Sequence, residues 1–214
     1  MDEEVTIIDS NTRNEKILNF FINNKKNLIV GFSIILVVII GYLSMKEMKE
    51  RDKIKLANQF NITTINFKTE DKQATINQLK KLISENDTTY SPLALYFLID
   101  NDLIDNKDEI NYLFDQLINE TSLDKEIKNL VIYKKGLFNS NFSTEGDLLQ
   151  ILGPIINSES IWKSHTLYLL AEYFYSQNQK EKAKEFFTQL VNLPNVNNEI
   201  KLESEKRLKR DFSE

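Results

Sequence analysis

The sequence predicts an all-α protein, with one apolar helix near the N-terminus followed by a solenoid of helical hairpins. Three observations support this fold class. The 214-residue chain contains only 5 Gly and 3 Pro, too few for a turn-rich β fold. One run of residues near the N-terminus carries no charge. Beyond residue 70 the apolar residues recur at helical spacing, and the helical pattern itself repeats.

The uncharged run covers residues 27–45, NLIVGFSIILVVIIGYLSM. As a helix it would rise about 28 Å, close to the hydrocarbon thickness of a bilayer. A cleaved signal peptide is the alternative, and it would need a shorter apolar core and a cleavage site of small residues. The following YLSMKEMKE offers no such site. The sequence therefore predicts a retained signal anchor.

The charges beside the anchor leave its orientation open. Within about 15 residues of the run, four Lys or Arg residues precede it and five follow it, so the positive-inside count is nearly tied. Lys25 and Lys26 directly adjoin the run, which favours a cytoplasmic N-terminus.

The anchor divides the chain into four regions: an N-terminal segment (1–26), the anchor (27–45), a helical connector (46–70) and a helical domain (71–214). The connector begins KEMKERDKIKLANQF, which alternates charge sign without a helix-breaking residue. This pattern predicts that the anchor helix continues beyond the membrane.

A short apolar cluster lies in the N-terminal segment, within EKILNFFINN. It consists of Ile17, Leu18, Phe20, Phe21 and Ile22. Two interpretations are open: the cluster lies in the membrane interface or touches a membrane partner, or it only extends the anchor helix.

Three segments of the helical domain carry an apolar stripe at i, i+3, i+4, i+7 and i+8. The stripes begin at Ile110, Leu148 and Ala183, at intervals of 38 and 35 residues. A weaker copy lies in TINQLKKLIS, where Lys80 takes a core-like place. Further helices are expected at roughly 90–103, 125–138 and 162–177. Because one helix pair cannot bury both of its apolar faces, neighbouring pairs are expected to stack into a solenoid.

The last helix pair, SHTLYLLAEYFYSQNQKEKAKEFFTQLVNLP, resembles the tetratricopeptide repeat. Leu170 and Ala171 stand where that motif has a large and a small residue, and Phe174 takes the aromatic place of the first helix. Ala183 and Phe187 take the small and aromatic places of the second helix. A small residue on each helix lets the two cross closely.

Two features depart from the tetratricopeptide pattern. Leu167 replaces the usual Trp, and Gly153-Pro154 falls inside the second helix of the middle pair. That dipeptide is expected to kink or interrupt the helix. A polar helix around 197–210 is expected to close the solenoid.

The plan of the whole chain resembles the YfgM-type, tetratricopeptide-like proteins of the bacterial inner membrane. A short acidic N-terminus, an aromatic segment, the anchor and an unbroken charged helix follow one another in the same order. Local matches occur in ENDTTYSPLALYFL and in the Trp-led last hairpin. The matching positions are Phe20, Phe21, Lys26, Tyr90, Leu93, Ala94 and Trp162.

This resemblance implies a single-pass protein of the inner membrane, with its N-terminus in the cytoplasm and its C-terminal domain in the periplasm. It implies a non-enzymatic adaptor whose protein partners are translocon subunits, periplasmic chaperones or exported clients. The alternative is a structural scaffold for assembly of another cell-envelope complex. An enzyme is the third class, and no string that carries the resemblance is catalytic.

The sequence offers no candidate catalytic, cofactor or metal site. The absence of Cys excludes disulfides, thiolate metal ligands and a Cys nucleophile. The one His, His165, has no second His at ligand spacing and is expected at the surface. No phosphate-binding or nucleophile-elbow motif occurs. The net charge of −5 disfavours nucleic acid as a partner, and no small-molecule substrate is expected.

One face of the helix at 162–177 is a candidate peptide-binding groove. It carries His165, Tyr168, Glu172 and Tyr175. In tetratricopeptide folds this face of the first helix lines the concave surface, and Tyr beside polar groups suits peptide contact. The alternative is that these residues pack against the following helix or face water.

Overall fold

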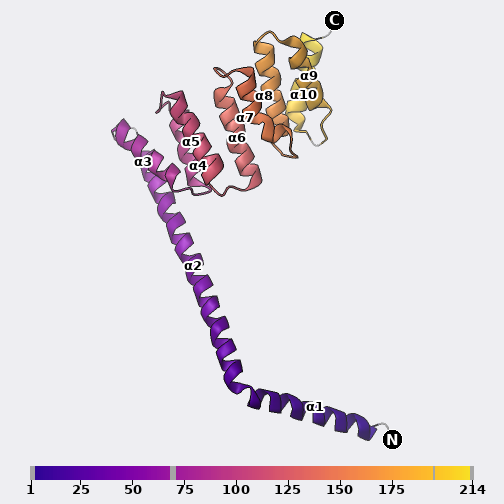
Figure 1. Ribbon diagram of the computed structural model, residues 1–214. Coiled ribbons are helices and arrows are strands. Elements are labelled where there is room, and N and C mark those ends of the chain that lie inside the picture. Colours follow the sequence, from indigo (N-terminus) through magenta and orange to yellow (C-terminus); the bar gives the residue numbers. More distant parts are fainter. Residues whose placement is uncertain (1–2, 68–70, 195, 213–214) are drawn as a thin grey trace. The chain divides into compact units, whose positions relative to one another are not determined.

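The computed structural model describes residues 3–67, 71–194 and 196–212, and among these residues every regular element is an α-helix (Figure 1). The all-α prediction is confirmed. The chain divides into two units, Met1–Lys55 and Leu56–Glu214.

The first unit contains α1 (Glu3–Asn23) and the beginning of α2 (Lys25–Asn66). Asn24 forms a turn between them, yet the Asn24 N–H still donates to the Phe20 carbonyl at 3.0 Å. The Leu28 N–H donates to the Asn24 carbonyl at 2.9 Å. Helical hydrogen bonding therefore continues across the boundary, although the flank and the anchor are two helices.

Helix α2 contains the predicted anchor and the connector as far as Asn66, which confirms that the helix continues past the apolar run. Its last turns belong to the second unit, where Leu56 and Phe60 pack against a core cluster. Thr63 is buried, and its hydroxyl donates a hydrogen bond to Oε1 of Gln78 at 2.7 Å. The end of the connector is thus part of the folded domain. Connector residues 68–70 lie outside the described residues.

The remaining helices of the second unit lie close to their predicted places, and each packs against the next along the chain. They are α3 (Lys72–Ser84), α4 (Tyr90–Asp100), α5 (Lys107–Glu120), α6 (Lys125–Asn139), α7 (Glu145–Ile156), α8 (Lys163–Ser176), α9 (Lys180–Val191) and α10 (Asn198–Asp211).

Local sequence signals set many of the helix boundaries. Asn106, Thr144 and Asn197 cap α5, α7 and α10, because their side chains accept hydrogen bonds from backbone N–H groups of the first turn. Left-handed residues follow three of the helices, where short polar side chains tolerate positive φ. They are Asn86 (φ 54°), Asp102 (φ 49°) and Asn178 (φ 58°).

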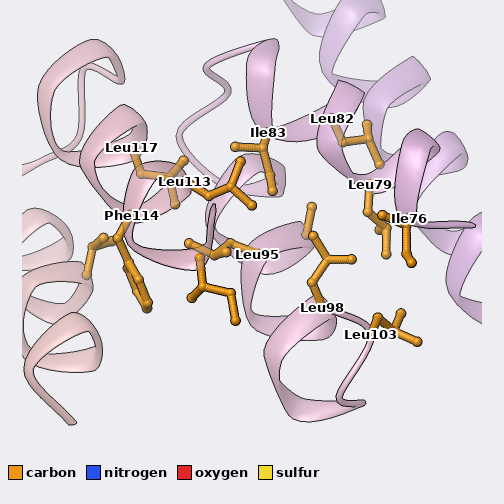
Figure 2. Close-up of a cluster of buried hydrophobic side chains, with 13 residues drawn as sticks. Ile76, Leu79, Leu82, Ile83, Leu95, Leu98, Leu103, Leu113, Phe114 and Leu117 are labelled. Carbon is orange, nitrogen blue, oxygen red and sulfur yellow. The ribbon is translucent and has the colours of Figure 1, made fainter. Parts of the chain in front are cut away.

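The apolar stripes predicted from the sequence form the core. The first cluster lies mainly between α3, α4 and α5 and is mostly aliphatic; Figure 2 shows Leu79 and Ile83 of α3 with Leu95 of α4 and Leu117 of α5. Among the described residues of this cluster, Phe114 is the one aromatic side chain that is fully buried. Lys80 does not take a core position as predicted: it is partly buried and forms an ion pair with Glu109.

The second cluster lies between α6, α7, α8 and α9 and is richer in aromatic residues. The rings of Phe174 and Phe186 stack at 5.3 Å, and Tyr173 packs edge-on against Phe174 at 5.4 Å. Leu152 and Phe187, from the matched stripes, are both fully buried. Both therefore lie on the buried side of their helices, as the apolar stripes predict.

Two small residues have different surroundings in the hairpin of α6 and α7. Gly136 of α6 faces Leu152 so closely that an added Cβ would lie 2.4 Å from its Cδ2 atom. Gly153 of α7 has open space around it. The expected interruption at Gly153-Pro154 is wrong, because α7 runs through both residues to Ile156. Pro154 removes one backbone N–H donor from the helix, and only two helical residues follow it.

Candidate functional site

The predicted anchor is an apolar helix that no other described part of the chain buries. Among the described residues, α2 is the one helix long and apolar enough to cross a membrane, with a window of mean hydropathy 2.6. None of that window is buried. Phe32 and Val37 are 67% and 68% exposed. Such a surface is stable only when another apolar medium covers it.

The apolar cluster ahead of the anchor is also exposed. Leu18, Phe20, Phe21 and Ile22 of α1 are each more than half exposed, and the two Phe rings meet edge to face at 6.0 Å. The cluster therefore offers a second apolar surface, next to the anchor in sequence.

The face predicted to bind peptide is largely used inside the protein. Glu172 accepts two hydrogen bonds from Arg207 of α10, at 2.8 and 2.7 Å. The Arg207 guanidinium also lies 4.4 Å from the centre of the Tyr175 ring. The Tyr168 ring packs against Phe187 of α9 at 5.8 Å. Three of the four residues thus bind neighbouring helices, as in the packing alternative.

Arg207 links α10 to α8, because it contacts Glu172 and Tyr175 of α8 and also pairs with Asp211 of its own helix. Its Nη1 donates to Asp211 at 2.5 Å, and its side chain is only 11% exposed. Because α10 contacts α8 directly, a ligand on this face would have to share it with α10. A peptide groove at these residues remains a prediction.

His165 points its ring at a different neighbour. It lies 5.2 Å from the Trp162 ring and 5.9 Å from the Tyr133 ring of α6, and Tyr133 stacks on Trp162 at 5.8 Å. Trp162 Nε1 donates to the Glu126 carbonyl at 3.0 Å, which fixes the cluster. His165 is partly buried rather than fully at the surface as expected, and burial lowers its pKa below 6.5.

An open groove lies between α4 and α6, with a volume of about 410 Å³. We call it the α4–α6 groove. Residues of α4, of α5 and of α6 with its following turn line it, among them Tyr96, Ile99, Phe114, Lys134, Leu137 and Phe142.

The mouth of the α4–α6 groove combines apolar side chains with cations. Leu137 and Phe142 are 42% and 38% exposed. Lys107 Nζ lies 4.0 Å from the centre of the Phe142 ring. Lys134 Nζ lies 5.5 Å from the centre of the Tyr96 ring. Both contacts are in the range of cation–π attraction, which holds the ammonium groups at the groove.

Tyr96, which lines this groove, also has a polar group without a partner among the described residues. Its hydroxyl is buried and has no hydrogen-bond partner in the described chain. Burial raises its pKa, so the hydroxyl stays protonated and remains a donor at neutral pH. A buried hydroxyl without a partner costs free energy that a ligand acceptor could recover.

Sequence reasoning missed this groove, and the repeat would not have located it. The second and third apolar stripes are 35 residues apart, and the same shift carries the face predicted on α8 to Leu130, Tyr133, Leu137 and Ser140 of α6 and its C-cap. Of these four positions only Leu137 lines the groove, whereas Tyr133 packs against Trp162 and His165.

No group of three or more His, Cys, Asp or Glu residues is placed to hold a metal ion in the described part of the chain. Comparison with known proteins adds no assignment: no family model, no curated protein and no solved structure matches the sequence.

Proposed function

We propose that this protein is a membrane-anchored, non-enzymatic adaptor that presents a tetratricopeptide-like domain to protein partners at the bacterial inner membrane. The observation that carries the proposal is the pairing, in one chain, of an exposed apolar helix with a helical domain that has a solvent-open groove. The partners we propose are the protein-export translocon and periplasmic chaperones or exported clients, and this choice rests on the YfgM-type resemblance.

The anchor and the domain have different tasks in this proposal. Anchoring confines the chain to the membrane plane and raises its effective concentration near any membrane partner, so weak contacts are sufficient. We assign the translocon contact to residues 14–45, which include the exposed apolar cluster and the apolar run. The second unit contacts chaperones or clients.

An anchor exchange tests this division. Residues 14–45 are replaced by an unrelated signal anchor, and both proteins are purified in gentle detergent for a comparison of their partners. We expect the chimera to lose the translocon and to keep its periplasmic partners. The control is extraction of the membranes at alkaline pH, which must show the chimera to be inserted as well as the original. Equal recovery of the translocon with the chimera would contradict the assignment.

The proposed topology places the N-terminus in the cytoplasm and the domain after Met45 in the periplasm. Protease added to intact spheroplasts should therefore remove that domain. A cytoplasmic protein in the same cells serves as the control for spheroplast integrity. Full protection of the domain would show that the chain has the opposite orientation.

A further inference from the structure

We propose that the α4–α6 groove binds a protein segment that carries an aromatic or branched aliphatic side chain beside a carboxylate. This inference deepens the proposed function and rests on it in one respect, that the helical domain binds protein. The occupant follows from three features of the groove: its apolar lining, its charges and its unused hydroxyl.

The lining suits one apolar side chain of a partner. Phe114 is 1% exposed and lies 6.2 Å from Phe138, whose ring meets Phe142 at 5.2 Å. These rings form an aromatic wall that leads from the core to the mouth of the groove. Leu137 remains 42% exposed at the mouth. An aromatic or aliphatic side chain placed there would cover apolar area that water now contacts.

The charges favour an acidic partner. Lys107 and Lys134 contact aromatic rings, and neither has a carboxylate within ion-pair distance in the described chain. Lys135, by contrast, pairs with Asp115 at 2.6 Å. Asp100 also lines the groove, so its charged lining is two lysines and one aspartate, a net positive site in a chain whose net charge is −5. Charge complementarity of this kind selects acidic ligands over basic ones.

The Tyr96 hydroxyl supplies a donor for the same ligand. The hydroxyl is buried and has no hydrogen-bond partner among the described residues, and Lys134 Nζ lies over the ring of the same tyrosine. Because the hydroxyl is closed off from solvent, a ligand carboxylate or carbonyl reaches it only if side chains that line the groove move, and it then gains a hydrogen bond at little further desolvation cost to the hydroxyl.

The test uses the full-length protein in nanodiscs of uncharged phosphatidylcholine and two fluorescent peptides. One peptide has Phe and Leu flanked by Asp and Glu, and the other has the same apolar residues flanked by Lys and Arg. Fluorescence anisotropy measures both affinities, with empty nanodiscs as the blank. We expect the acidic peptide to bind at least about tenfold more tightly than the basic one, with the difference falling as salt is added.

Charge reversal locates the binding. The double variant Lys107→Glu with Lys134→Glu should bind the acidic peptide with an affinity at least about tenfold lower, and should prefer the basic peptide. The matched control is Lys81→Glu with Lys184→Glu, two exposed lysines outside the groove, which changes net charge equally. Circular dichroism confirms that both double variants are folded.

Tyr96→Phe gives a second, independent measurement. Because the hydroxyl has no partner among the described residues, its removal should leave the unfolding midpoint unchanged or raise it. Affinity for the acidic peptide should fall by roughly three- to tenfold. An unchanged affinity would exclude the hydroxyl from the site.

Three outcomes would overturn the proposal: equal binding of the two peptides, equal loss in the two double variants, or a concentration-dependent dimer that only Lys107→Glu with Lys134→Glu abolishes. The last would show a second copy of the chain in the groove. These outcomes leave the adaptor function standing if the protein still recovers its membrane partners. Peptide binding without any recovered partner would show the reverse.

Discussion

Residues 27–45 and helix α9 use the same apolar residue types and differ in how they space them. In the anchor, apolar residues occur on all sides of the helix and none of its apolar window is buried. In α9, Ala183, Phe187 and Leu190 lie on one side and are all fully buried, while charged residues occupy the other. The comparison teaches that the share of charged residues and the spacing of the apolar ones together distinguish a helix suited to lipid from one covered by protein on one side.

The difference implies that the two regions can be disrupted separately. A substitution in the anchor should alter membrane association and leave the folding of the second unit unchanged. A substitution in the core should do the opposite.

Two charges in the anchor should release the protein from the membrane. Ile35→Arg with Val38→Arg places both near the middle of the apolar run, where each charge costs about 2.5–3.5 kcal/mol of insertion free energy. The combined cost, roughly 5–7 kcal/mol, offsets most of the apolar gain of the run. Alkaline extraction of membranes should find the variant in the soluble fraction.

The matched control for this variant is Ile35→Leu with Val38→Leu, which keeps the run apolar and should remain in the membrane. The urea midpoint of the second unit should be the same in both. Retention of the charged variant in the membrane would show that another part of the chain holds it there.

Removal of one core ring should have the reciprocal effect. Phe187 is fully buried against Tyr168 and Phe212, so Phe187→Ala leaves a cavity and should cost about 3–5 kcal/mol of unfolding free energy. Urea unfolding of a fragment from residue 50, followed by Trp162 fluorescence, measures the loss. Membrane association of the full chain should not change. An unaltered midpoint would mean that Phe187 is exposed and the repeat register is wrong.

Glycine substitutions compare the two regions at finer scale. Gly136→Ala forces a Cβ against buried Leu152, and such overpacking costs about 1–3 kcal/mol, partly offset by about 1 kcal/mol of helix propensity. Gly153→Ala, and Gly41→Ala in the anchor, meet no atom within 4 Å and should be neutral or slightly stabilising. Thermal melts of the three variants check the order. A Gly136→Ala protein as stable as Gly153→Ala would show that Leu152 can move away.

The sequence predicted the helices and their buried faces well, because both depend on local spacing. The stripes that begin at Ile110, Leu148 and Ala183 correspond to α5, α7 and α9, and their first residues are buried. The closing helix was expected at 197–210 and is observed at Asn198–Asp211. Caps such as Thr144 explain why the boundaries were close.

The predicted peptide-binding face stays a prediction, because a site depends on contacts between distant residues that no local pattern in the sequence shows. The pairing of Glu172 with Arg207, 35 positions away, has no local signature, and it places α10 against the predicted peptide face. The α4–α6 groove likewise joins Tyr96 to Lys134 across two helices. Lys80 was misplaced for a similar reason, since its partner Glu109 lies on another helix.

Acid should lower the stability of the second unit slightly and leave membrane association unchanged. His165 is the residue whose titration we expect to cause this loss. Burial holds the pKa of His165 below 6.5, so the folded protein keeps a neutral ring where the unfolded chain already binds a proton. The stabilising contribution is complete above pH 6.5 and is lost as the pH falls through 6.5 toward the folded pKa. The urea midpoint should therefore be lower at pH 5.5 than at pH 7.5, which are about one unit below and above the ordinary His pKa. His165→Gln should show a smaller decrease.

Two carboxyl groups act in a separate pH range and do not confuse this measurement. A hydrogen bond from Lys182 lowers the pKa of Glu145, and one from Arg210 lowers the pKa of Asp211, so their contributions are lost as the pH falls from the ordinary carboxyl pKa toward the lowered one. Because His165 is the one His in the chain, its ring protons can be titrated by NMR without assignment. The anchor run has no group that titrates in this range, so membrane association should be constant from pH 7.5 to pH 5.5. An NMR pKa at or above 6.5 would contradict the burial of the ring and, with it, the expected loss of stability in acid.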